Sequence, residues 1–349
     1  MPRRGARQVP ERKRRSAAQP PAPDSATTPE QIDERAAAGL LPERPARGHK
    51  GTFGKLLVIA GSVDYAGAAL LVCTAAGRAG AGLVTLAVPE SLQPLFAAKV
   101  VEATTMPLAE DDVEEVDPEL AVARILDHDH DALVVGPGLR PALATAELVR
   151  GILANPEEPP CPAVVDAEAL RSLAAEDGWW EGVVRPSVLT PHSGEFTRLR
   201  AASGVAAGAD GDLVNDDAAR AAAAIDAART WGQVVVLKGA RTVIAGADGR
   251  AAVAPFENPG LATGGTGDVL AGTIGSLLAQ GCAPYDAARL GVYLHGAAGE
   301  AVRARIGDAG LLASDLPLEV ARARHRLAAR RSGGRIGFGV PAHEGAGHD

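Results

Sequence analysis

A glycine-rich segment followed by an acidic residue is the part of this sequence that points most directly to chemistry. Residues 258–272 read NPGLATGGTGDVLAG, in which Asp268 comes directly after Gly264, Gly265, Thr266 and Gly267. Glycines let a backbone approach an anion closely, and the free N–H groups of a first helical turn attract phosphate. A carboxylate beside such a loop can act as the general base in phosphoryl transfer. A glycine-rich helix cap, in which Asp268 only matches the helix dipole, explains a bare GTGD equally well.

Polar residues also follow two of the apolar, strand-like segments. In SVLTPHSGEF, a helix that begins at Ser193 would place His192 at its cap and Glu195 in its first turn. There His192 could hydrogen-bond a substrate amide, and Glu195 could bind magnesium through water. A capping box between the two residues is the simpler explanation. Asp166, which ends the segment AVVD, is either a helix cap or a carboxylate that faces a ligand.

A lysine and several small or basic residues follow another apolar segment, VVVLKGART. They are Lys238, Gly239, Ala240, Arg241 and Thr242. Ligands of open parallel sheets bind at the carboxyl ends of strands, so these residues could contact the phosphates and ribose of a nucleotide. A β-turn with solvated charges is the alternative. Gly136 and Gly138, which end ALVVGPGL, occupy the same kind of position and also fit a simple turn.

Two common nucleotide-binding motifs are missing from the front of the chain. The stretch GHKGTFGKLLVIAG is not a Walker A loop, because its spacing is wrong and Leu56 follows Lys55 where Ser or Thr is required. No GxGxxG follows the segment 55–61, which argues against a Rossmann dehydrogenase. Beyond this segment, Ala68 and Ala69 lie near the start of a predicted helix and could cover a substrate ring.

The elements that must position these residues alternate along the chain. Apolar, β-branched runs at 55–61, 83–89, 132–138, 163–168, 187–192 and 234–239 predict strands buried on both faces. Helices are predicted at 67–80, 141–154 and 215–231, and then at 265–280, 284–306 and 314–331. The segment 242–255 predicts a hairpin that turns at Asp248 and Gly249, and hence an antiparallel edge. We therefore expect one three-layer α/β/α domain with a mostly parallel sheet over residues 48–331.

Both ends of the chain are predicted to be disordered. Residues 1–47 are rich in Pro, Arg, Ala and Glu and lack apolar periodicity, although a short helix is expected around residues 31–40. Residues 332–349 are Gly-rich and polar.

Composition narrows the class of protein. The 349 residues carry a formal net charge of −8, which disfavours general nucleic-acid binding despite a basic cluster at residues 12–15. No apolar run reaches the roughly 20 residues that cross a bilayer. The three cysteines, Cys73, Cys161 and Cys282, lack the spacing of a zinc site or a disulfide framework. We expect a cytoplasmic enzyme that acts on a small molecule, without a nucleic-acid or membrane partner.

Seven segments, taken together and in order, resemble the ADP/ATP-dependent NAD(P)H-hydrate dehydratase family, whose fold is ribokinase-like. They are HKGTFGKLLVIAGS, YAGAALL, VVGPGL, VVDAEAL, LTPHSGEF, LKGART and NPGLATGGTGDVLAG, and they span about residues 48–306. The combination of TPHSGE with NPGLATGGTGD is the specific part, because GTGD-like loops occur across ribokinase-like kinases. The resemblance implies repair of hydrated NADH and NADPH (NADHX and NADPHX), with ADP or ATP as co-substrate and Mg²⁺ as the accompanying cation.

The resemblance also assigns roles by position. It implies a hydrate site at Ala68 or Ala69, Gly138, His192 and Asp268. It implies a nucleotide site at Lys238, Gly239, Ala240, Arg241, Thr242 and Gly267. In the implied reaction, Asp268 deprotonates the C6 hydroxyl of the hydrated nicotinamide ring. That oxygen attacks the terminal phosphoryl group of the nucleotide, and elimination of phosphate then restores the double bond.

Two other functions would use the same features. A ribokinase-like kinase of a thiazole or pyrimidine alcohol would employ the loop and Asp268 equally well, whereas His192 and the stretch 238–242 favour the dehydratase. An intact Asp268 disfavours a non-catalytic nucleotide-binding regulator. The resemblance further suggests a homo-oligomer, such as a tetramer. Only about 47 irregular residues precede the predicted domain, so the epimerase domain that many relatives carry is expected to be absent.

Overall fold

A ten-stranded sheet forms the centre of the computed structural model, which describes residues 28–111, 115–155, 161–206, 208 and 211–331. The strands lie in the order β1-β10-β9-β8-β7-β6-β5-β2-β3-β4. Their bounds are β1 Glu30–Gln31, β2 Lys55–Ile59, β3 Leu83–Pro89, β4 Thr104–Leu108, β5 Ala132–Val135, β6 Ala163–Val165, β7 Ser187–Leu189, β8 Val234–Leu237, β9 Val243–Ala245 and β10 Ala251–Val253. All pairings are parallel except those of β9, which runs antiparallel to β8 and β10. The predicted mostly parallel sheet with an antiparallel edge is confirmed.

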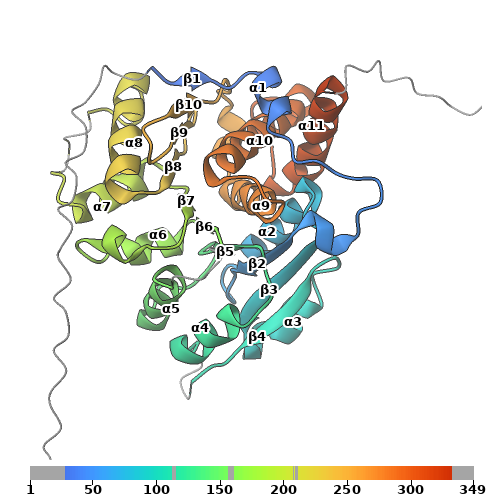
Figure 1. Ribbon diagram of the computed structural model, residues 1–349, viewed down its shortest axis with the longest axis vertical. Helices are drawn as coiled ribbons and strands as arrows, with labels where there is room; N and C mark the ends of the chain where they lie inside the picture. Colours follow the sequence, from blue (N-terminus) through green and yellow to red (C-terminus); the bar gives the residue numbers. More distant parts are fainter. Residues whose placement is uncertain (1–27, 112–114, 156–160, 207, 209–210, 332–349) are drawn as a thin grey trace, which may run out of the picture.

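Helices cover both faces of this sheet (Figure 1). One face carries α1 Glu34–Gly39, α2 Ala66–Ala79, α9 Thr266–Ala279, α10 Pro284–Ile306 and α11 Leu316–Arg331. The other carries α4 Pro118–Leu126, α5 Leu143–Leu153, α6 Glu168–Leu173, α7 Ser193–Ala202 and α8 Asp217–Trp231. The short α3, Gln93–Ala97, contributes Phe96 to the first layer. Along β2, Leu56 and Val58 enter the first layer, whereas Leu57 and Ile59 enter the second. Burial on both faces explains why the strand segments are apolar throughout.

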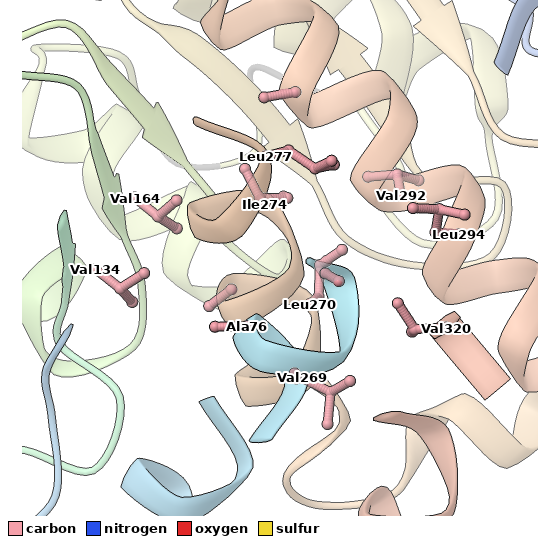
Figure 2. Close-up of a cluster of buried hydrophobic side chains, with 14 of the residues drawn as sticks. Ala76, Val134, Val164, Val269, Leu270, Ile274, Leu277, Val292, Leu294 and Val320 are labelled. Atoms are coloured by element: carbon pink, nitrogen blue, oxygen red, sulfur yellow. The ribbon is translucent and has the colours of Figure 1, made fainter. Parts of the chain in front are cut away.

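Helix α9 lies in the middle of the first layer, as Figure 2 shows. Its Val269 and Ile274 belong to the same buried cluster as side chains of β5, β6, α10 and α11, among them Val134 and Val164. Glycine makes the close approach possible, because a Cβ at Gly272 would lie only 2.3 Å from the carbonyl oxygen of Val72 in α2. This packing fixes the position of the first turn of α9 relative to the sheet.

The predicted disordered arm is too long. Residues 28–47 are ordered: β1 pairs with β10, and the predicted short helix is present as α1. Ile32 is fully buried and Ala37 lies in the cluster with α10 and α11. Only a few apolar residues cover the edge of the sheet here. Because the segment is so short, its sequence shows no apolar periodicity that would predict order. Residues 1–27 and 332–349, for which disorder was predicted, lie outside the described part of the chain.

Other differences from the predicted elements have local causes. Strand β4 was missed because it contains Pro107 and pairs only with β3 at the edge of the sheet. Helix α4 was missed although Asp117 caps it, accepting a hydrogen bond from the backbone of Leu120 at 2.9 Å. The hairpin is confirmed, with Gly249 in a left-handed conformation at its turn. Among the described helices, none is both long and apolar enough to span a membrane.

Candidate active site

The loop at the start of α9 has the geometry of an anion-binding turn. Gly265 caps the helix with φ of 90°, and a Cβ there would come within 2.8 Å of Leu71 and 3.0 Å of Ala313, so glycine is required. The hydroxyl of Thr266 donates to the carbonyls of Leu261 and Thr263, at 2.7 and 2.9 Å, and fixes the loop.

The glycines on either side of Thr266 leave the first turn of α9 open to a ligand. A Cβ at Gly264 would meet nothing within 4 Å, so the outside of the turn is free. A Cβ at Gly267 would lie 3.5 Å from the Nζ atom of Lys238. The four residues of the predicted anion loop thus lie together at the N-terminus of a helix of 14 residues. Backbone N–H groups at a helix N-terminus favour negative charge.

Asp268 lies in the first turn of α9 and is largely buried. Burial, reinforced by the charge of Asp166, raises the pKa of Asp268 to about 7, although Lys238 opposes the shift. A carboxyl group with such a pKa can both accept and release a proton near neutral pH. This property suits a general base in a proton-transfer reaction.

A buried ion pair lies beside this turn. Asp166 follows β6 and Lys238 follows β8, and their Oδ1 and Nζ atoms are 2.8 Å apart. The Asp166 side chain is only 2% exposed, and Glu195 Oε2 lies 3.9 Å from the same Nζ. Burial lowers the pKa of Lys238, but Asp166 and Glu195 more than offset this effect and raise the pKa overall. The lysine therefore stays protonated, which suits contact with a phosphate group.

His192 and Glu195 form the capping box that the sequence offered as the simpler explanation. Nδ1 of His192 accepts hydrogen bonds from the backbone N–H groups of Gly194 and Glu195, and its own backbone N–H donates to Glu195 Oε2 at 2.9 Å. Since Nδ1 is an acceptor, the ring proton is on Nε2. The His192 side chain is 56% exposed, and its Nε2 lies 3.5 Å from Glu195 Oε1.

Most of the predicted nucleotide residues line one cavity of about 500 Å³. Lys238, Gly239, Ala240, Thr242 and Gly267 all contribute to its wall. Arg241 does not, because its guanidinium group lies 3.1 Å from Asp217 and 4.0 Å from Glu257. The structure therefore assigns the Arg241 side chain to the rim ion pairs, while its neighbours line the cavity.

Ala68 and Gly138, two residues of the predicted hydrate site, lie against each other. Gly138 has φ of 68°, and a Cβ there would be 2.8 Å from both the Ala68 Cβ and the Tyr65 carbonyl oxygen. Ala69 is fully buried beneath Gly61, so of the two alanines only Ala68 has accessible surface. Gly136 has a packing role, because a Cβ there would lie 1.9 Å from the backbone oxygen of Asp166.

Several cavity and loop residues gave no signal in the sequence. In the apolar part of the cavity they are Ala254, Phe256, Val292, His295 and Gly296, from the hairpin exit and α10, whereas Leu261 and Leu270 belong to the glycine-rich segment 258–272. Arg220 of α8 is fully buried and donates hydrogen bonds to the carbonyls of Leu237, Lys238 and Ala240, supporting the lysine loop from behind. An arginine or a histidine inside a helix has no motif around it, so only the fold reveals these contacts.

Comparisons with known proteins give a consistent result. The family model described as NAD(P)H-hydrate dehydratase matches residues 56–321. The chain is 44% identical over 282 residues to a bifunctional NAD(P)H-hydrate repair enzyme of Moorella thermoacetica, covering 79% of this chain and 50% of that protein. It is 38% identical to an ADP-dependent (S)-NAD(P)H-hydrate dehydratase of Xanthomonas campestris, covering 80% of this chain and 91% of that protein.

A solved structure agrees with these relatives. The crystal structure of an ADP/ATP-dependent NAD(P)H-hydrate dehydratase from Bacillus subtilis, co-crystallised with ATP and Mg²⁺, superposes with a TM-score of 0.69. The sequence identity is 33%, and the match covers 85% of this chain and 98% of that one. The chain spans about half the length of the bifunctional relatives that it matches.

Proposed function

Because the chain belongs to the NAD(P)H-hydrate dehydratase family, we propose that it is an ADP-dependent (S)-NAD(P)H-hydrate dehydratase, which restores NADH and NADPH from their hydrates. The observation that carries this proposal is the placement of Asp268. Asp268 lies in the first turn of α9, where the charges of Asp166 and Lys238 act on its carboxyl group and where the preceding Gly267 lines a cavity of nucleotide size.

The residues divide the chemistry between them. Asp268 accepts the proton of the C6 hydroxyl, and the hydroxyl oxygen attacks the terminal phosphorus of ADP. The bond from that phosphorus to the bridging oxygen breaks, and AMP leaves. The phosphate ester then eliminates: the C6–O bond breaks, C5 loses a proton to water, and the ring double bond is restored. Phosphate carries away the hydroxyl oxygen, so the sum is hydrate plus ADP giving dinucleotide, AMP and phosphate.

Lys238 and the α9 turn stabilise the transferred group. Negative charge develops on the phosphoryl oxygens during the transfer. It is stabilised by the protonated Lys238 and by the backbone N–H groups of Gly264, Gly265 and Gly267. Ala68 and Gly138 provide a flat surface for the hydrated ring. The His192 side chain, which is 56% exposed, can donate from Nε2 to the amide oxygen of that ring in place of its present contact with Glu195 Oε1 at 3.5 Å. These assignments follow the family by position.

Magnesium is the cation that we expect to accompany the nucleotide. Glu195 fits an indirect role, because its Oε2 already accepts the backbone N–H of His192 and lies near Lys238. Over the described residues, no group of three or more metal-ligating side chains occurs. Mg²⁺ usually keeps several waters and binds through phosphate and one or two carboxylates. The donors therefore fit a hydrated Mg²⁺ that arrives with the nucleotide, where it would neutralise phosphate charge.

A recovery assay tests the proposal. NADPH hydrate and ADP with Mg²⁺ should regain the absorbance of the dihydronicotinamide ring in the presence of the protein, and omission of nucleotide should prevent recovery. Asp268→Asn should lower turnover by about a hundredfold or more while ADP still binds. Asp127→Asn, at the exposed C-terminal end of α4, is the matched control and should behave as wild type. Phosphorylation of a thiazole or pyrimidine alcohol, without NADPH recovery, would instead support the kinase.

We also propose that the chain acts as a homo-oligomer in the cytoplasm. The three cysteines are free, which fits a reducing compartment. Sedimentation velocity of the purified protein measures the assembly directly, and a single species of monomer mass would contradict the oligomer.

A further inference from the structure

His295 is a buried histidine that the proposed chemistry does not use. It lies on α10, is 9% exposed, and contributes to the wall of the 500 Å³ cavity together with Val292 and Gly296. Its Nε2 atom is 2.9 Å from the carbonyl oxygen of Thr266, in the first turn of α9. The side chain thus joins the apolar part of the cavity to the anion loop.

The contact with Thr266 determines the tautomer of the ring. A carbonyl oxygen can only accept, so Nε2 carries the proton and donates. Burial lowers the pKa of His295 to about 4, with a smaller contribution from Lys238, so the ring is neutral at physiological pH. Nδ1 is then a lone-pair acceptor, and it has no hydrogen bond within the part of the chain that the structure describes. A ligand in the cavity can supply the missing donor.

The two ends of the cavity select different parts of a ligand. Lys238, Gly239 and Gly267 lie at the phosphate end, beside the α9 turn. Near His295 the wall is apolar, with Leu270, Val292 and the ring of Phe256, which packs so closely on Gly296 that a Cβ there would be 2.1 Å away. A flat aromatic base fits between these apolar walls, and a base with an N–H group would satisfy His295.

We propose that Nδ1 of His295 accepts a hydrogen bond from the exocyclic amino group of the nucleotide base, so that His295 selects adenine nucleotides. This inference rests on the proposed function, because it assumes that the cavity holds the co-substrate. A base that lacks the amino group leaves Nδ1 buried without a donor, and sites built to bind a donor reject such analogues.

Binding of matched nucleotides to the wild-type protein tests the proposal without any turnover. Calorimetry should show that purine riboside 5′-diphosphate, which lacks the 6-amino group, binds about tenfold more weakly than ADP. By contrast, 2′-deoxy-ADP should bind within about twofold of ADP if the base, rather than the ribose, supplies the donor. Equal affinity for ADP and the purine analogue would overturn the proposal, and so would a loss confined to the deoxy analogue.

Two substitutions separate the acceptor from the contact with Thr266. His295→Gln can keep a donor to the Thr266 carbonyl but carries no acceptor at the Nδ1 position, so the preference for ADP over the purine analogue should disappear. His295→Asn places an amide oxygen near the Nδ1 position and should retain the preference, even if overall affinity falls. The exposed His325→Gln serves as the matched control and should retain wild-type affinities.

The two proposals fail in distinguishable ways. Absence of ADP binding to the wild-type protein would contradict the proposed function itself. Binding of ADP with normal hydrate repair, but with no preference over the purine analogue, would contradict only the role of His295.

Discussion

At the scale of single residues, Asp268 combines a useful pKa with a cost in stability. Its pKa of about 7 lies above the ordinary value of 3.8, because the folded protein buries the carboxyl group near Asp166. A raised carboxyl pKa means that the folded state binds more protons than the unfolded state between those two values. The contribution of Asp268 to stability therefore becomes less favourable as pH rises from about 4 to 7.

Asp268→Asn should consequently raise stability at pH 8, although it lowers turnover by about a hundredfold or more. We expect a gain of about 1–2 kcal/mol in the free energy of unfolding, after allowance for solvent screening of a partly exposed group. Thermal unfolding at pH 8 and at pH 4 measures this effect. The gain should become small at pH 4, close to the ordinary pKa of 3.8, because the carboxyl group is protonated in the folded state and only partly ionised in the unfolded state. A pH-independent gain would contradict the explanation.

Lys238 is expected to serve both the ligand and the fold. Lys238→Ala should weaken ADP binding by about tenfold or more, since a charge-assisted contact with phosphate is lost. It should also destabilise the protein by about 3 kcal/mol, because Asp166 is left buried and unpaired. Calorimetry and chemical denaturation measure the two effects separately.

The double variant Lys238→Ala/Asp166→Asn separates these roles. Stability should recover in large part, because the uncompensated buried charge is removed, whereas ADP affinity should stay low. Recovery of affinity in the double variant would show that Lys238 acts only through Asp166, and would remove it from the nucleotide site.

At the scale of elements, the position of α9 depends on small residues that face its neighbours. Gly272 and Gly77 both lie inside helices, in α9 and α2, but their surroundings differ. A Cβ at Gly272 would be 2.3 Å from the Val72 carbonyl oxygen, whereas a Cβ at Gly77 would meet nothing within 4 Å. Helix propensity favours alanine at both positions, so the packing around each glycine decides whether substitution by alanine stabilises or destabilises the protein.

Gly272→Ala and Gly77→Ala should therefore change stability in opposite directions. We expect Gly272→Ala to destabilise by about 1–3 kcal/mol through overpacking, and Gly77→Ala to stabilise by up to about 1 kcal/mol through helix propensity. Denaturant unfolding of both variants measures this difference. A stabilised Gly272→Ala protein would show that α2 and α9 can separate without cost.

The sequence predicts strand ends well, and with them much of the candidate site. Asp166, His192, Lys238 and Gly138 all follow apolar runs, and parallel strands bring their carboxyl ends to one edge of the sheet. The apolar half of the cavity could not be predicted in this way. Val292 and His295 lie inside an ordinary amphipathic helix, and only the packing of α10 against α9 turns that face into a cavity wall.

At the scale of the whole molecule, the N-terminal segment completes the layer that contains the site. Strand β1 extends the sheet beyond the antiparallel edge, and α1 packs against α10 and α11. Ile32, between β1 and α1, is fully buried and its backbone N–H donates to the Val253 carbonyl at 2.9 Å. A sequence window around Ile32 is mostly polar, so the local pattern predicts a disordered arm with only a short helix around residues 31–40. The partner surface that orders the segment lies more than 200 residues away.

Ile32→Ala should show how much this distant contact contributes. Removal of a buried isoleucine leaves a cavity and should destabilise the protein by about 2–4 kcal/mol. Ile306→Ala is the matched control, since that side chain is 49% exposed at the end of α10 and should lose under about 1 kcal/mol. Denaturant unfolding at constant pH measures both variants. Equal effects of the two substitutions would mean that β1 and α1 are not stably docked, and that the folded unit begins after residue 47 as the sequence pattern predicts.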